Sequence, residues 1–159
     1  MFALSEFDKL RAVRARNYLA SVRAAKARLL RQHDRRAEQL ERMGMKAIVY
    51  TGMPGNPNSY GDAIPDGVAK LDVIDDLVSA AVAEWNETLA QAMKCLYAMP
   101  DPDYSELLER HYIDGEIWAV VALNMGKSVS WCQYSRLPAL MQLYDTMPSE
   151  YRIPRVPAL

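Results

Sequence analysis

Apolar residues recur at helical spacing in two long stretches of this chain, and glycines and prolines gather between them. Residues 1–49 predict a long basic helix over residues 4–46, with Ser5 as its N-cap and a thin apolar stripe. Residues 68–99 carry a stronger stripe and an acidic opposite face, and they predict a second long helix. Residues 50–67 hold four glycines and three prolines and predict a connector.

A more compact helical pattern occupies residues 100–147. Asp103 is predicted to cap its first helix, with Glu106 as the capping-box partner, and the Asp114-Gly115 pair is predicted to end it. The proline-containing residues 148–159 follow the unit and predict an irregular tail.

The same unit contains two further predicted helices. A short, very apolar helix over residues 116–124 leads into a turn, residues 125–127, and Ser128 then caps a third helix in which Pro138 is expected to cause a kink. Two helices joined by a short turn with a glycine are the pattern of a DNA-binding helix-turn-helix. The chain therefore predicts an all-α fold, with two long helices (an extended hairpin or a coiled-coil-like pair) followed by a C-terminal helix-turn-helix unit.

Charge is divided unevenly along the chain. Residues 1–46 hold twelve basic and five acidic side chains, whereas the remaining residues hold seven basic and fifteen acidic ones. Such a division indicates either a basic face for nucleic acid or two halves that pair with each other. The simplest packing of the long helices is antiparallel, basic against acidic.

Several functional classes are disfavoured by the sequence. No run of 18 apolar residues and no signal peptide occur, so we expect no membrane partner and a cytoplasmic protein.

Cys95 and Cys132 stand alone on helical patterns and are predicted to be buried, reduced thiols. His33 and His111 are far apart, without ligands at metal-site spacing, so no metal or other cofactor is expected. No nucleophile–base arrangement is visible, and we predict a protein that is not an enzyme and has no catalytic residue.

The stretch PDPDYSELLERHYIDGEIWAVVALNMGKS resembles sigma-factor region four and the related phage and prophage family of ArpU-type late transcription regulators. The matching elements are Pro100-Asp101, Leu107-Leu108, Arg110, Tyr112, Gly115, Trp118, Val121-Ala122, Met125-Gly126, Ser128, Ala139-Leu140 and Leu143. The connector is also similar to a segment of the phage proteins, through Gly52-Met53-Pro54, Gly61-Asp62, Val68 and Leu71.

This resemblance implies a phage or prophage transcription regulator whose sigma-like helix-turn-helix recognises double-stranded DNA at a promoter or operator. The long helices would then mediate homodimerisation or contact RNA polymerase. The residues predicted to meet DNA lie on the first turns of the third helix: Lys127, Ser130, Trp131, Gln133, Tyr134 and Arg136. A glutamine can pair with adenine, and a lysine with guanine or phosphate. The alternative for Trp131 and Tyr134 is that they cover the second helix or a dimer partner.

Residues 101–147 hold three basic and seven acidic side chains, so this unit should bind DNA weakly alone. The arginines between Arg11 and Arg36 either follow DNA phosphates or form a solvated face that pairs with acidic groups.

Two rival functions stay open. One is a small terminase subunit for DNA packaging, which ring formation would favour over a dimer. The other is an interaction protein whose helix-turn-helix has lost DNA binding, which the acidic unit and Pro138 favour.

Overall fold

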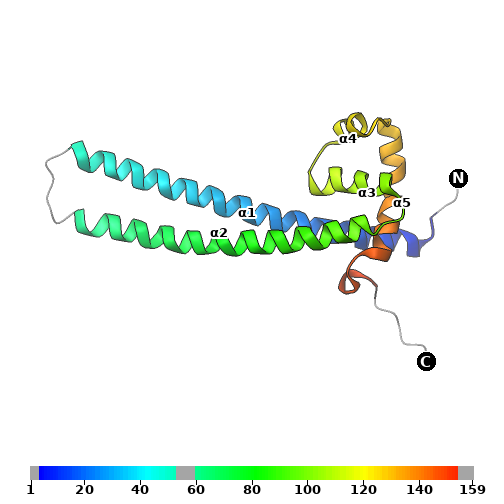
Figure 1. The fold of residues 1–159 in the computed structure, drawn as a ribbon, viewed down its shortest axis with the longest axis horizontal. Helices are drawn as coiled ribbons and strands as arrows, with labels where there is room; N and C mark the ends of the chain where they lie inside the picture. Colours follow the sequence, from blue (N-terminus) through cyan, green and yellow to red (C-terminus); the bar gives the residue numbers. More distant parts are fainter. Residues whose placement is uncertain (1–3, 53–59, 154–159) are drawn as a thin grey trace, which may run out of the picture. The chain divides into compact units, whose positions relative to one another are not determined.

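The structure, a computed structural model, describes residues 4–52 and 60–153, and side chains over residues 4–44 and 66–153. Over these residues it contains helices and no strand, which confirms the all-α prediction (Figure 1). The elements are α1 (Glu6–Gly52), α2 (Tyr60–Tyr97), α3 (Pro102–Leu108), a π-helical turn (Glu109–Ile113), α4 (Trp118–Met125), α5 (Val129–Thr146) and a 3-10 turn (Ser149–Tyr151). None of the described helices is both long and apolar enough to cross a bilayer.

The chain divides into two compact units, and α1 and α2 each contribute to both. Residues 25–86 form the first, which we call the hairpin unit; residues 1–24 and 87–159 form the second, the terminal unit. The compact helical pattern of residues 100–147 therefore does not stand alone. The first turns of α1 and the last turns of α2 belong to the same unit.

In the hairpin unit, α1 and α2 lie side by side and antiparallel (Figure 1). Arg28 pairs with Glu84, and Arg36 Nε lies 2.6 Å from Asp75 Oδ1. A residue later in α1 therefore contacts a residue earlier in α2, as expected for antiparallel helices. These contacts confirm the expected pairing of basic with acidic helix. Because the four side chains are substantially exposed, water and salt screen both pairs and each contributes little to stability.

The predicted connector, residues 50–67, is shorter than expected. α1 continues to Gly52 and α2 already begins at Tyr60, whereas residues 53–59, with the Met53-Pro54 pair of the family resemblance, lie outside the described residues.

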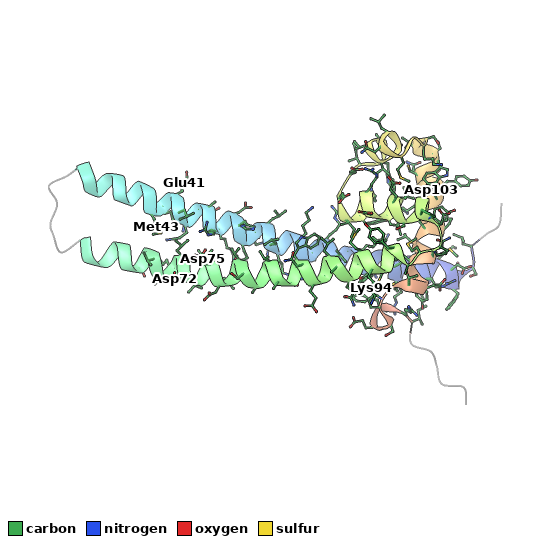
Figure 2. All side chains as sticks on the ribbon, in the orientation of Figure 1. Glu41, Met43, Asp72, Asp75, Lys94 and Asp103 are labelled. Carbon is green, nitrogen blue, oxygen red and sulfur yellow. The ribbon has the colours of Figure 1, made fainter. Side chains whose placement is uncertain are left out.

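Gly67 lies inside α2, where its carbonyl accepts a hydrogen bond from Gln39 Nε2 at 3.3 Å. A Cβ atom there would stand 3.3 Å from Met43 Cγ, and Figure 2 shows Met43 on the side of α1 toward α2. The close packing of α1 against α2 explains the glycine at this position, although helix propensity alone disfavours a glycine inside a helix.

The core of the terminal unit is built from five helices. Its largest fully buried side chains are Leu19, Val22, Leu96, Leu107, Leu108, Val121, Cys132, Leu140, Leu143 and Met147. One stripe at helical spacing predicts a core of Leu107, Leu108, Trp118, Val121 and Ala122, and all of these except Trp118 are buried. Trp118 differs from that prediction because it opens α4 and is only half-buried, with its ring stacked on the His111 imidazole.

The first helix of the compact unit starts earlier than predicted. The N-cap of α3 is Asp101, whose Oδ1 accepts hydrogen bonds from the backbone nitrogens of Asp103 and Tyr104 at 2.9 and 3.4 Å. Pro102 takes the first helical position, where a residue with a fixed φ and no N–H is favoured. Asp103 is therefore not the cap. The predicted break is confirmed, since Gly115 has a φ of +76°.

Part of the predicted irregular tail is ordered against the terminal unit. The 3-10 turn Ser149–Tyr151 places the Tyr151 ring 4.9 Å from that of Tyr18. The Arg152 guanidinium donates to the carbonyl oxygens of Met147 and Asp145, at 2.7 and 2.9 Å, and so satisfies acceptors at the end of α5. Residues 154–159 lie outside the described part of the chain.

Candidate nucleic-acid interface

A three-residue turn, residues 126–128, joins α4 to α5. Gly126 ends α4 in the left-handed conformation, with φ +65° and ψ 32°, and its N–H donates back into α4. Ser128 Oγ then accepts a hydrogen bond from the Trp131 backbone nitrogen at 3.0 Å, which confirms Ser128 as the N-cap of α5. The two residues fix the direction in which α5 leaves the turn.

Buried side chains hold α5 against the rest of the terminal unit. Cys132 and Ser135 face inward along its first half and Ala139 along its second, and the helix packs chiefly against α3 and α4. Burial raises the pKa of the Cys132 thiol, so this thiol stays protonated and structural. Cys95 is buried as well, and both thiols are free, as the sequence predicts. α5 continues through Pro138 to Thr146.

The opposite side of the same half-helix is exposed. Ser130, Gln133 and Tyr134 are accessible, and Tyr134 exposes 77% of its surface. These three side chains lie within about 100° of one another around the helix axis, because each residue turns by about 100°. The start of α5 therefore presents a stripe with hydroxyl, amide and phenol groups.

Lys127 and Trp131 form one flank of this stripe. Lys127 Nζ lies 5.0 Å from the centre of the half-buried Trp131 ring and 3.6 Å from Asp103 Oδ2. Asp103, labelled in Figure 2, follows the start of α3, so its carboxylate draws the lysine toward the body of the unit. The Lys127 charge is thus partly neutralised at this position.

Arg136 lies one helical turn after Gln133, at the edge of the stripe that faces α1. It lines a groove of about 230 Å3 with Leu137 and Leu140 of α5 and Ala12 and Arg16 of α1. Lys9 and Val13 complete the α1 side of this groove. The structure therefore brings five of the predicted residues to the start of α5 and places the sixth beside α1.

Ion pairs with carboxylates neutralise two of the three basic residues in the acidic segment 101–147. Arg110 lies 2.9 Å from Glu106 Oε1 and 3.4 Å from Glu116 Oε1, so two carboxylates neutralise it. With Lys127 near Asp103, only Arg136 among the basic residues of this segment has no ion pair with a described carboxylate. Positive charge for a polyanion must therefore come largely from α1.

Sequence reasoning missed one surface of the terminal unit. α4 exposes apolar side chains along one side: Ile117 just before it (66% exposed), Val120, and Leu123 (80% exposed). The spacing of Val120 and Leu123 signals a shared helix face, but the very apolar composition of this helix points to burial on every side. Among the described residues there is no group of three or more side chains able to hold a metal ion.

Comparison with known proteins gives no match for this chain among family models, curated proteins or solved structures. The resemblance to the ArpU-type regulators therefore stays a prediction that rests on its quoted residues.

Proposed function

We propose that this protein is a phage or prophage transcription regulator that binds double-stranded DNA with α4 and α5 as a helix-turn-helix. The observation that supports this most is the exposed stripe at the start of α5, Ser130, Gln133 and Tyr134, on a helix fixed by the capped turn before it. A recognition helix reads the major groove through its first turns, so this is the half of α5 that must be free.

Each exposed group has a chemical role in this proposal. The Gln133 amide can donate to and accept from adenine in the major groove, and the Ser130 hydroxyl can bond either a base edge or a phosphate. Tyr134 offers an apolar ring that can contact a thymine methyl and a hydroxyl that can reach a phosphate. Lys127 would exchange its contact with Asp103 for guanine or phosphate.

We further propose that the protein acts as a homodimer built on the hairpin unit, which would present two recognition helices to a two-fold symmetric site. The hairpin unit exposes apolar side chains that two helices alone do not cover, among them Leu30 (54% exposed) and Val73 (60% exposed). Contact with RNA polymerase belongs to the same proposal and rests on the family resemblance.

A substitution at Gln133 tests base reading directly. Duplexes selected from random sequence by the wild type are titrated by gel shift with Gln133→Ala and with the control Gln91→Ala, an exposed glutamine on α2. We expect Gln133→Ala to relax preference at one base pair by roughly 1–3 kcal/mol and to leave the salt dependence unchanged. Equal preference for the two variants contradicts base reading by α5, and failure of the wild type to select any duplex contradicts DNA binding.

One observation favours the second candidate, an interaction protein without DNA binding. The apolar side of α4, with Ile117, Val120 and Leu123, is better suited to a protein partner than to phosphates. Leu123→Asp separates the two candidates, with Gln91→Glu, at an exposed position on α2, as a control of equal added charge. A DNA-binding regulator tolerates both variants similarly, whereas an interaction protein loses its partner with Leu123→Asp alone.

A further inference from the structure

Three arginines from two helices gather at one edge of the terminal unit. Arg16 and Arg23 are seven residues apart on α1, so they lie on one side of that helix. Arg136 of α5 lines the same groove as Arg16. Arg23 Nη2 lies 4.0 Å from the position that a Cβ atom on Gly115 would occupy, next to the π-helical turn. We call Arg16, Arg23 and Arg136 the arginine cluster.

Two titratable residues, His111 and Tyr112, lie near the cluster. Burial lowers the pKa of His111, and the charges of Arg23 and Arg136 lower it further, against an opposing hydrogen bond to the Glu116 carbonyl. Burial raises the pKa of Tyr112, and the charges of Arg136 and Arg16 oppose that rise. Arg136 therefore shares one neighbour with each α1 arginine, His111 with Arg23 and Tyr112 with Arg16.

No carboxylate among the described side chains neutralises the cluster. Several other arginines are paired, such as Arg11 with Asp145, Arg28 with Glu84 and Arg110 with Glu106. Arg16, Arg23 and Arg136 make no ion pair with any carboxylate that the structure describes. Three like charges kept close together without counter-charge raise the local potential and favour an anionic ligand.

The form of the site favours an extended anion over a small one. The groove between Arg16 and Arg136 is open, and Ala12, Val13, Leu137 and Leu140 form its apolar floor. Arg16 and Arg23 are separated by roughly 10 Å along α1 at 1.5 Å per residue. One DNA strand advances about 3.4 Å per phosphate, so this separation corresponds to about three phosphates.

The cluster also adjoins the stripe proposed to read bases. Gln133 precedes Arg136 by three residues, about one helical turn, so the two are neighbours on the α5 surface. We propose that Arg16, Arg23 and Arg136 bind the phosphate backbone of the DNA whose bases α5 reads. This inference rests on the proposed function. It makes α1 part of the interface and supplies the positive charge that residues 101–147 lack.

Guanidinium groups suit this role because their planar fork binds two phosphate oxygens at once. The test compares a cluster variant, Arg16→Gln with Arg23→Gln and Arg136→Gln, with a control variant, Arg31→Gln with Arg35→Gln and Arg42→Gln. The three control arginines lie on α1 in the hairpin unit, so the control variant also loses three positive charges, but outside the cluster. Both full-length proteins are first checked for wild-type helicity and melting temperature.

Gel-shift titrations over a salt series then measure affinity for a duplex that the wild type selects. We expect the cluster variant to bind at least about ten-fold more weakly, with a slope of log affinity against log salt smaller by about three. The control should change the slope by less than about one. Substituting lysine for the three cluster arginines should retain most of the slope and lose part of the affinity, because lysine keeps the charge without the fork.

The outcomes separate this inference from the function on which it rests. Equal losses in cluster and control variants, or an unchanged slope in the cluster variant, overturn the inference while DNA binding itself survives. If the wild type selects no duplex at all, the proposed function fails and the inference fails with it. A cluster variant that binds DNA normally but loses an acidic protein partner overturns the phosphate assignment.

Discussion

The rings of His111 and Trp118 lie face to face, with centroids 3.7 Å apart and 13° between their planes. His111 belongs to the π-helical turn, and Trp118 is the first residue of α4. His111 Nδ1 also donates to the Glu116 carbonyl oxygen at 2.8 Å. These two contacts fasten α4 to the turn before it, and they therefore fix the helix from which α5 departs.

We expect Trp118→Ala to destabilise the terminal unit by about 2–3 kcal/mol, less than the 3–5 kcal/mol typical of a fully buried aromatic residue. The ring is only half-buried, but its removal leaves one face of the imidazole without a partner. Urea denaturation measures the change. Trp118→Phe keeps a stacked ring and should lose less than half as much; equal losses for the two variants would show that stacking contributes nothing.

Much of the fold is predictable from the sequence because it depends on local chemistry. Ser128, Gly126 and Gly115 fix helix ends through their own backbone preferences, and the stripe of α2 marks a buried face. The position of Arg136 beside α1 is not predictable in this way, because helical periodicity gives the angle of a residue on its own helix but not the helix that packs next to it.

The extent of the terminal unit is harder to predict than its individual helices. Leu19 and Val22 of α1 and Leu96 of α2 are fully buried in the terminal unit, so the predicted boundary cuts through its core. A thin apolar stripe on α1 looks insufficient for a core helix when the partners that complete the packing lie about a hundred residues away. The arginine cluster is hidden from the sequence for the same reason.

Stability should fall in mild acid through His111. Burial keeps its folded-state pKa below the ordinary 6.5, so the unfolded chain binds this proton at a higher pH than the folded chain does. The contribution of neutral His111 is therefore full above about pH 6.5 and is lost as the pH falls toward the folded pKa. Melting temperatures from pH 7.5 to about 5.5 should drop less for His111→Gln than for the wild type.

The exposed His33 supplies the control for this pH dependence, since His33→Gln leaves the buried imidazole in place. Acidic groups common to all three proteins cancel in the comparison. Identical pH profiles for wild type and His111→Gln would contradict the assignment.

Two glycines should respond in opposite directions to the same substitution. Gly126→Ala forces an L side chain into a φ of +65° and should cost about 1–2 kcal/mol, although a Cβ there meets no atom within 4 Å. Gly44→Ala also meets no atom within 4 Å but lies inside α1, where alanine should stabilise by about 0.5–1 kcal/mol. Thermal denaturation of both variants checks this, and a stabilising Gly126→Ala would mean that the turn before α5 does not constrain it.

Light scattering should give a mass well above that of the 18.0 kDa chain if the hairpin unit forms a dimer. Val73→Asp places a charge on an exposed apolar position and should shift the protein toward monomer. Ser79→Asp adds the same charge on another side of α2 and should leave the mass unchanged. A wild-type monomer at micromolar concentration contradicts the dimer, and a ring of many copies would favour a packaging subunit.

Sequencing of the genomic DNA that the full-length protein captures tests the central claim, sequence-specific DNA binding by α5, most directly. We predict that wild type enriches fragments with a shared motif in promoter or operator regions and that Gln133→Ala enriches the same regions with one base position relaxed. Capture of no fragment above background, or of a packaging site alone, would contradict the account.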